Sequence, residues 1–183
     1  MEVDLEKQTD GIWTIGHSTR STVEFNEILL AHQISALVDV RSFPGSRRYP
    51  HFNKQALASN LEAIGILYAH NPKLGGRRRP APNSKNTAWK NASFRAYADH
   101  MEGEEFRRGI EDLLQIADTK RTAIMCAEAL WWRCHRSLIA DYLKASGEAV
   151  IHILDANHTE VHPFTAAASI VNGELSYAGL LVE

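Results

Sequence analysis

A cysteine lies among positively charged side chains in the segment LWWRCHRSLIADYL, residues 130–143. Arg133, Cys134, His135 and Arg136 directly precede a run with helical apolar spacing, so we expect Cys134 at the start of a helix. A helix N-terminus and neighbouring cations lower the pKa of a thiol and favour the nucleophilic thiolate. The same position suits a bound phosphate or carboxylate, held by helix N–H groups, His135 and Arg136. In the alternative interpretation, Arg136 pairs with Asp141 or a nearby acid, and Cys134 fills space.

Polar and reactive residues also follow four segments that we expect to be β-strands. In chain order these residues are Gly16, His17, Ser18, Asp39, Arg41, Ser46, Arg47, Gly75, Gly76, Cys126 and Glu128. Ligands of open α/β sheets bind outside the carboxyl ends of the strands, so we expect these residues to share one site. The candidates for catalysis are Cys134, Glu128, His17, Cys126 and Asp39. The candidates for binding an anionic substrate are Arg41, Ser46, Arg47, Ser18, Gly75, Gly76, His135 and Arg136.

Each of these residues also has a purely structural interpretation. His17 could bond only to the neighbouring backbone, and Asp39 could cap the turn that follows it. Cys126 ends the apolar run AIMC, and a free cysteine is often a small buried hydrophobe. The sequence leaves these alternatives open, but the coincidence of reactive residues at four strand ends favours a site.

Several known motifs are absent from the sequence. It has neither GxxxxGK[ST] nor GxGxxG, and it has no C-x-x-C pair. The spacing from Cys126 to Arg133 is one residue too long for the C-x5-R loop of cysteine phosphatases. Cys126, Cys134, His135 and His17 could surround a zinc or iron ion, but C-x7-C is not a usual structural zinc spacing. We therefore name no metal ligand and leave the cofactor unknown.

Alternating strands and helices position these residues. We expect strands at 12–15, 36–40, 66–70, 121–128 and 148–154, and helices near 21–33, 53–65, 106–120 and 134–147. This alternation predicts a single α/β domain over residues 1–183, with a three-layer, Rossmann-like, mainly parallel five-stranded sheet and helices on both faces. Asn172-Gly173 between two strand-like runs suggests a C-terminal hairpin with a type I′ turn.

Charge is distributed unevenly along the chain. The net charge is −2, yet eleven of the 20 Lys and Arg residues lie in 41–95, with Glu62 as the one acid there. Such an excess favours an anionic small molecule or a nucleic acid as partner, although a solvated surface is the alternative. Its most basic part, 71–92, has no period and is expected to be a long loop.

Two cysteines are too few for a disulfide scaffold and fit reduced cytosol. The start, MEVDLEKQTD, has no apolar signal-peptide core, and no apolar run approaches membrane-spanning length. We therefore expect a cytoplasmic protein with no membrane partner.

The ordered motifs WTIGHS, LVDVRSFPGSRR, LGG, MCAEALWWRCHR and HI resemble those of a bacterial family, domain of unknown function 488, over about residues 12–165. The resemblance implies a small α/β protein and places the candidate residues named above on matching positions. Family members often have a proline between the two motif cysteines, where this chain has AEALWWR. The resemblance names no reaction.

Two main functions follow from these residues. The first is an enzyme acting on a phosphate-bearing or other anionic substrate, such as a nucleotide or nucleic-acid end, by thiol- or acid/base-assisted hydrolysis or transfer. The second is a noncatalytic nucleic-acid-binding module that uses the basic segment, with Trp89 stacking on a base. A metal-binding protein that uses the Cys and His residues is a lesser alternative.

Overall fold

Four of the five parallel strands are buried along most of their length because helices cover both faces of the sheet that they form. The computed structural model describes residues 10–179, so residues 1–9, from which we argued against a signal peptide, lie outside the described part. The parallel strands are β1 (Ile12–Gly16), β2 (Ala36–Asp39), β3 (Leu67–His70), β4 (Thr122–Cys126) and β5 (Val150–Ile153). The sheet order is β3-β2-β4-β1-β5-β6, so the carboxyl ends of the first five strands share one edge.

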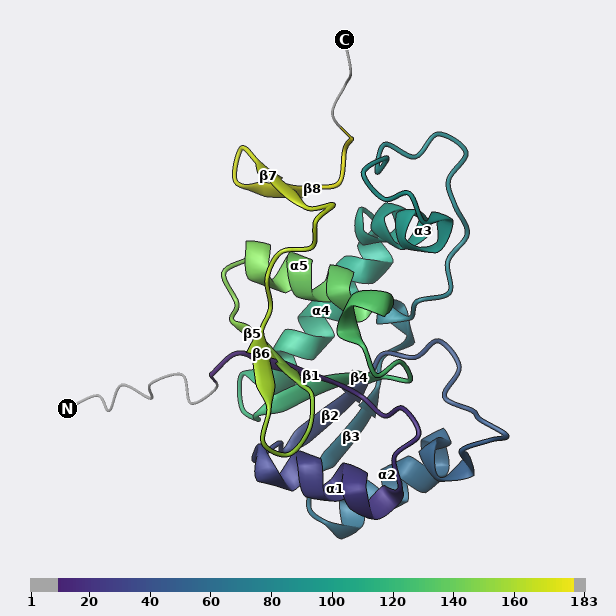
Figure 1. Ribbon diagram of the computed structural model, residues 1–183, viewed down its shortest axis with the longest axis vertical. Helices are drawn as coiled ribbons and strands as arrows, with labels where there is room; N and C mark the ends of the chain where they lie inside the picture. The colour runs from purple at the N-terminus through teal and green to yellow at the C-terminus, as the bar shows by residue number, and fades with distance from the viewer. Residues whose placement is uncertain (1–9, 180–183) are drawn as a thin grey trace, which may run out of the picture.

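Helices cover both faces of this sheet (Figure 1). On one face lie α1 (Thr22–Ala31) and α2 (Lys54–Ala63), whose Phe25 and Leu57 pack with Leu37 of β2. On the other face lie α4 (Glu104–Ala117) and α5 (Arg136–Ala145), whose Leu113 and Leu138 share a cluster with the next strand residue, Val38. Successive strand residues point to opposite faces, so each strand contributes to two cores. The predicted three-layer, Rossmann-like α/β fold is confirmed.

Short elements complete the chain. Between residues 10 and 179 the connections contain three 3₁₀ helices: η1 (Pro50–Phe52), η2 (Pro72–Leu74) and η3 (Trp131–Arg133). The predicted C-terminal hairpin consists of β7 (Ser169–Val171) and β8 (Glu174–Ser176). Its turn residues Asn172 and Gly173 have φ values of 53° and 84°, and a type I′ turn requires positive φ at both positions. The expected hairpin and its turn are therefore confirmed.

Two elements were not predicted from the sequence. Strand β6 (Thr159–Val161) pairs antiparallel with β5, which makes a sheet of six strands rather than five. It is only three residues long, too short to show a period. Helix α3 (Ala92–Met101) is capped by Asn91, whose side chain accepts hydrogen bonds from the N–H groups of Ser93 and Phe94. Its Phe94, Tyr97, Ala98 and Met101 have helical spacing, a signal that was present in the sequence.

The basic segment 71–92 is a loop, as expected, but most of it is fastened to neighbouring helices. Arg78 forms an ion pair with Glu105 and donates to three backbone carbonyls. Asp99 of α3 accepts hydrogen bonds from the loop side chains of Ser84 and Asn86. Trp89 packs against Phe94 and Tyr177, with ring centroids 4.9 and 5.7 Å away. The Trp89 ring is thus occupied within the protein.

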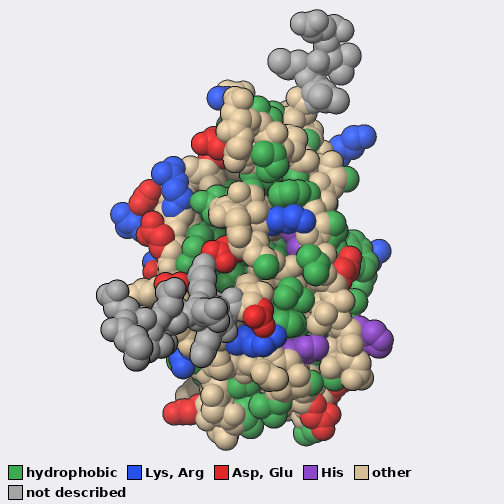
Figure 2. All heavy atoms as spheres, turned by 90° about the vertical axis from the view of Figure 1, so that its left-hand side faces the viewer, with side chains coloured by type: hydrophobic (Ala, Val, Ile, Leu, Met, Phe, Trp, Pro, Cys, Tyr) green, Lys and Arg blue, Asp and Glu red, His purple; other side chains and the backbone are tan. Residues whose placement is uncertain are grey.

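The side of the molecule that carries β6 and the hairpin has interspersed hydrophobic and charged side chains (Figure 2). Val161 of the edge strand is 72% exposed, and Val171 of the hairpin is 52% exposed. A three-residue edge strand offers few free backbone groups for pairing with another chain. No helix among residues 10–179 is both long and apolar enough to span a membrane.

Candidate active site

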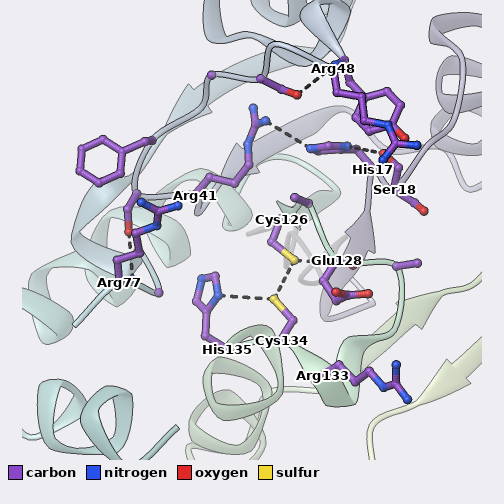
Figure 3. Close-up of a pocket in the computed structure, with 18 of the residues that line it drawn as sticks. His17, Ser18, Arg41, Arg48, Arg77, Cys126, Glu128, Arg133, Cys134 and His135 are labelled. Carbon is purple, nitrogen blue, oxygen red and sulfur yellow. Dashed lines mark hydrogen bonds between the residues drawn. The ribbon is translucent and has the colours of Figure 1, made fainter. Parts of the chain in front are cut away.

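A cavity of about 700 Å³ opens at the carboxyl edge of the sheet (Figure 3). Its walls come from the segments after β1, β2, β3 and β4 and from the start of α3. Four arginines line it, Arg41, Arg48, Arg77 and Arg133, whereas Glu128 is the one acid among the described lining residues. The convergence of four strand ends on one cavity matches the expectation from the order of the parallel strands.

The two cysteines lie at the floor of the cavity with their sulfurs in contact (Figure 3). Cys126 ends β4 and Cys134 precedes α5, and their Sγ atoms are 2.7 Å apart. Burial raises the pKa of Cys126 well above its usual value, and the bond to Cys134 adds to this rise. Burial alone would also raise the pKa of Cys134. The hydrogen bond from Cys126 and the charge of Arg136 outweigh it and lower the pKa of Cys134 to about 7.

Arg136 lies behind the sulfurs rather than in the cavity. Its side chain is 1% exposed, its backbone N–H donates to Cys134 Sγ at 3.5 Å, and its Nη2 donates to the carbonyl of Glu128 at 2.7 Å. Its Nε is buried without a hydrogen-bond partner. Burial would lower the pKa of Arg136, but the two neighbouring cysteine sulfurs outweigh burial and raise it. Among residues 10–179 Arg136 forms no salt bridge, so the alternative pairing with Asp141 or another nearby acid is not seen, and contact of Arg136 with a substrate stays a prediction.

His135 lies beside the Cys134 sulfur as a neutral imidazole. Its Nε2 donates to the carbonyl of Val40 at 3.1 Å, so its Nδ1 carries the lone pair. This Nδ1 is 3.4 Å from Cys134 Sγ and can accept the thiol proton. Burial lowers the pKa of His135, which keeps the ring uncharged. A Cβ on Gly76 would lie 2.6 Å from this Nδ1, so glycine at 76 leaves room for the ring.

Arg41 reaches the cavity wall in an orientation fixed by Asp39. Asp39 is fully buried and accepts from Arg41 Nε at 2.9 Å, from Arg41 Nη2 at 2.7 Å and from the Tyr68 hydroxyl at 2.7 Å. Its oxygens are thus engaged within the protein, and it does not line the cavity. The geometry favours a positioning role for Asp39, whereas proton transfer by Asp39 stays an untested prediction.

His17 completes this arrangement. Its Nδ1 donates to the carbonyl of Ser18 at 2.9 Å, so its Nε2 accepts from Arg41 Nη1 at 3.3 Å. Its ring stacks on Phe52 with centroids 4.2 Å apart. Burial lowers the pKa of His17 to about 4, so the ring is neutral at neutral pH. His17 lines the cavity and holds Arg41 from the side opposite to Asp39.

A second polar cluster lies on the far side of Arg136, and we call Thr14, Asp141, His152 and His162 the buried histidine cluster. Arg136 Nη1 donates to Thr14 Oγ1 (3.2 Å), and Thr14 Oγ1 donates to His152 Nδ1 (2.7 Å). His152 Nε2 donates to His162 Nδ1 (2.8 Å), and His162 Nε2 donates to Asp141 Oδ1 (2.9 Å). This is one consistent proton arrangement, and each of the four residues is at most 1% exposed.

The predicted site residues divide into two groups. Those that line the cavity are Cys134, Cys126, Glu128, His17, Arg41, Ser46, Ser18, Gly76 and His135. Those that do not line it are Asp39, Arg47, Gly75 and Arg136. Sequence reasoning did not single out the lining residues Arg48, Phe43 and Phe94. Phe94 belongs to the unpredicted α3, and nothing in the sequence SRRY distinguishes Arg48 from Arg47.

The His, Cys, Asp and Glu side chains of the described residues do not form a metal-binding site. Within the described residues 10–179, no three His, Cys, Asp or Glu side chains lie close enough together to hold a metal ion. The metal-binding alternative thus receives no support from the geometry.

A family model described as a domain of unknown function, DUF488, matches residues 21–143, which is more than half of the chain. The chain belongs to the DUF488 family. The match covers strands β2, β3 and β4, both cysteines and the start of α5, so most of the residues that line the cavity lie within the matched range. Comparison with curated proteins and with solved structures gives no match.

Proposed function

We propose that this DUF488 protein is an enzyme that uses Cys134 as a nucleophile on a phosphate-bearing or other anionic substrate, such as a nucleotide or nucleic-acid end. The observation that carries the proposal is a thiol with a lowered pKa at the floor of an arginine-lined cavity. Perturbed thiols in clefts are common at functional sites, since the thiolate is the reactive form.

Arg136 supplies the charge that a thiolate requires. A buried cation costs free energy unless an anion lies close to it. Arg136 is almost fully buried, and the cysteine sulfurs raise its pKa, so the Cys134 thiolate and Arg136 stabilise each other's charged forms. With a pKa of about 7, about half of the Cys134 side chains are ionised near neutral pH.

Proton movement at this site involves two residues. His135 Nδ1 is oriented to accept the proton of the Cys134 thiol. The sulfur then forms a bond to the electrophilic phosphorus or carbon of the substrate, and the leaving oxygen takes the bonding electron pair and a proton. The proton that His135 has taken from Cys134 is available for that oxygen, and Glu128, the acid on the cavity wall, is the candidate for relaying it. Water or another acceptor releases the group from sulfur, which gives a hydrolase or a transferase.

Substrate binding is assigned to the cavity arginines. Arg41 is held by two hydrogen bonds from its side chain to Asp39, so it needs little reordering when an anion binds. Arg48 and Arg77 lie on the same walls and add positive charge. A volume of about 700 Å³ is in the range of small-molecule sites.

A noncatalytic nucleic-acid-binding role is the second candidate. It is favoured by Phe43, which is 71% exposed on the cavity wall with Arg77 over its ring at 5.6 Å. An exposed aromatic ring beside arginines can stack on a base. Trp89, the ring first expected to do this, packs instead against Phe94 and Tyr177. Affinity that falls steeply with salt, without turnover, would favour this second role.

Site-resolved alkylation tests the enzyme proposal. The protein is treated with iodoacetamide across pH, and the modification rates of Cys134 and Cys126 are followed by peptide mass spectrometry. We expect half of the maximal rate at Cys134 near pH 7, slower or no modification of Cys126, and slower alkylation of Cys134 in the presence of pyrophosphate or a mononucleotide. If Cys134 titrates near the value of a free thiol, about 8.5, and anions do not protect it, the proposal is wrong.

A further inference from the structure

The two cysteines are in contact although they belong to different elements of the fold. Cys126 is the last residue of β4, and Cys134 lies eight residues later, before α5. Their Sγ atoms are 2.7 Å apart and point toward each other (Figure 3). Only a small approach separates this pair of thiols from a covalent bond.

The two thiols are unequal in reactivity. Cys134 lines the cavity, its pKa is lowered to about 7, and small molecules can reach it from the opening. Cys126 is 2% exposed, its pKa is raised, and its Sγ atom lies in contact with the Cys134 sulfur. An oxidant that enters the cavity therefore reacts first with the Cys134 thiolate. Cys126 remains a protonated thiol in contact with the oxidised sulfur.

We propose that Cys126 is the resolving thiol of Cys134, and that the pair closes a reversible disulfide when a hydroperoxide enters the cavity. This inference rests on the proposed role of Cys134 as the working nucleophile, because the disulfide removes that nucleophile. The oxidised protein is thus the inactive form of the proposed enzyme, and a dithiol restores the active form.

The two steps balance. The Cys134 thiolate attacks the distal oxygen of the hydroperoxide, the O–O bond breaks, and Cys134 becomes a sulfenic acid, while the departing alkoxide or hydroxide takes a proton from solvent water and leaves as an alcohol or water. The Cys126 sulfur then attacks the Cys134 sulfur, the S–O bond breaks, and the hydroxyl group leaves as water with the Cys126 proton. Reduction by an added dithiol returns two thiols and a disulfide of the reductant.

The arrangement protects the reactive sulfur. A sulfenic acid that meets further peroxide proceeds to sulfinic and sulfonic acids, which are not reversed by thiols. Because Cys126 is already in contact with Cys134, the disulfide can form without a large conformational change. Its formation therefore competes with the second oxidation.

Peptide mapping after treatment with hydrogen peroxide tests the inference. Trypsin cleaves after Arg121, Arg133 and Arg136, so a disulfide joins the otherwise separate peptides 122–133 and 134–136. We expect this linked pair in the wild type, its loss after dithiothreitol, and no adduct with dimedone, a reagent for sulfenic acid. In Cys126→Ser we expect a dimedone adduct on Cys134. Cys134 that peroxide oxidises further, to sulfinic or sulfonic acid, should not be restored by dithiothreitol. Cys134→Ser is the matched control and should show neither product.

Two outcomes overturn the inference. One is wild-type protein in which peroxide gives dimedone-labelled or sulfinic Cys134 without the linked peptides, and the other is Cys134 that peroxide leaves unmodified. Alkylation of the same unoxidised sample separates this failure from that of the proposed function. Suppose that Cys134 is alkylated with half of the maximal rate near pH 7 and is protected by anions, but that peroxide gives no disulfide. The enzyme proposal would then stand, and only the proposed role of Cys126 would be wrong.

Discussion

The cavity and the buried histidine cluster lie on opposite sides of Arg136 and use similar side chains differently. In the buried histidine cluster every polar group has a partner, and Asp141 accepts hydrogen bonds from His162, from Thr165 and from the Tyr177 hydroxyl. In the cavity, four arginines face one acid, and the Cys134 sulfur has only weak donors around it.

Solvent contact separates the two regions further. The four members of the buried histidine cluster are at most 1% exposed, whereas the cavity is open and includes the exposed residues Phe43, Arg48 and Arg77. Buried polar groups that are fully hydrogen-bonded contribute to a single folded arrangement. Exposed arginines beside an opening, here Arg48 and Arg77, are accessible to an anionic ligand.

The comparison shows that titratable side chains alone do not identify a site. Both regions contain histidines whose pKa burial lowers, His17 in one and His152 in the other. What distinguishes the cavity is an excess of one charge around an open volume, with a reactive sulfur at its floor. We therefore expect changes in the buried histidine cluster to reduce stability, and changes in the cavity to reduce binding and reactivity.

The largest expected effect is on stability, from Asp141→Ala. This change leaves His162, Thr165 and Tyr177 without their acceptor in a buried place, so we expect the free energy of unfolding to fall by about 3 to 5 kcal/mol. Urea denaturation measures it. Asp155→Ala is the control, because Asp155 is an exposed acid that also pairs with a histidine, and its midpoint should stay at the wild-type value. Equal midpoints for the two variants would contradict the structural role of the cluster.

The second prediction concerns acid. His17 and His152 have pKa values of about 4 and about 2, both lowered mainly by burial, against 6.5 for an ordinary histidine. Because the unfolded chain binds these protons more readily, stability is present above pH 6.5 and falls below it. Each histidine contributes a slope of up to about 1.4 kcal/mol per pH unit, roughly 3 kcal/mol for His17 by pH 4.

Urea denaturation as a function of pH separates the two histidines. His17→Gln should reduce the slope only between pH 6.5 and 4, whereas His152→Gln should reduce it at still lower pH as well. Measurements at pH 8 give the loss of hydrogen bonds alone and serve as the baseline. Slopes equal to that of the wild type in both variants would show that these rings are not buried in neutral form.

The main architecture and the location of the cavity were predictable because they depend on local apolar patterns. The apolar runs identified five strands, and the parallel order placed His17, Arg41 and Cys134 at one edge. The buried histidine cluster was not predictable in the same way. His152 and His162 meet through the β5–β6 pairing, in which His152 lies opposite Glu160, and a three-residue strand leaves no pattern in the sequence.

The directions of some individual side chains could not be predicted from the sequence. From its position at a helix start, Arg136 is predicted to bind substrate, but in the structure its guanidinium does not line the cavity and donates to the carbonyl of Glu128 and to the hydroxyl of Thr14. Asp39 and Arg41 pair with each other because residues two apart on an extended chain share one side. That pairing could have been inferred from their spacing.

The third prediction separates two adjacent arginines. Arg48 lines the cavity and Arg47 does not, although both are exposed. Arg48→Ala should weaken the binding of pyrophosphate or a mononucleotide about tenfold, or about 1.4 kcal/mol, and Arg47→Ala should leave it unchanged. Isothermal titration calorimetry measures both. Equal losses in the two variants would mean that the positive charge acts only as a general field.

The smallest expected effect is at Phe43, and it decides between kinds of anion. Phe43 is exposed on the cavity wall with the Arg77 guanidinium 5.6 Å from its ring centroid, an arrangement that suits a nucleobase but adds nothing for an inorganic anion. Phe43→Ala should therefore weaken mononucleotide binding by about 1 kcal/mol and leave pyrophosphate binding unchanged, while Phe43→Trp keeps the nucleotide affinity. Calorimetry with both ligands compares the variants. If Phe43→Ala weakens both ligands equally, Phe43 only shapes the loop that carries Arg48, and the aromatic part of the proposed substrate has no support.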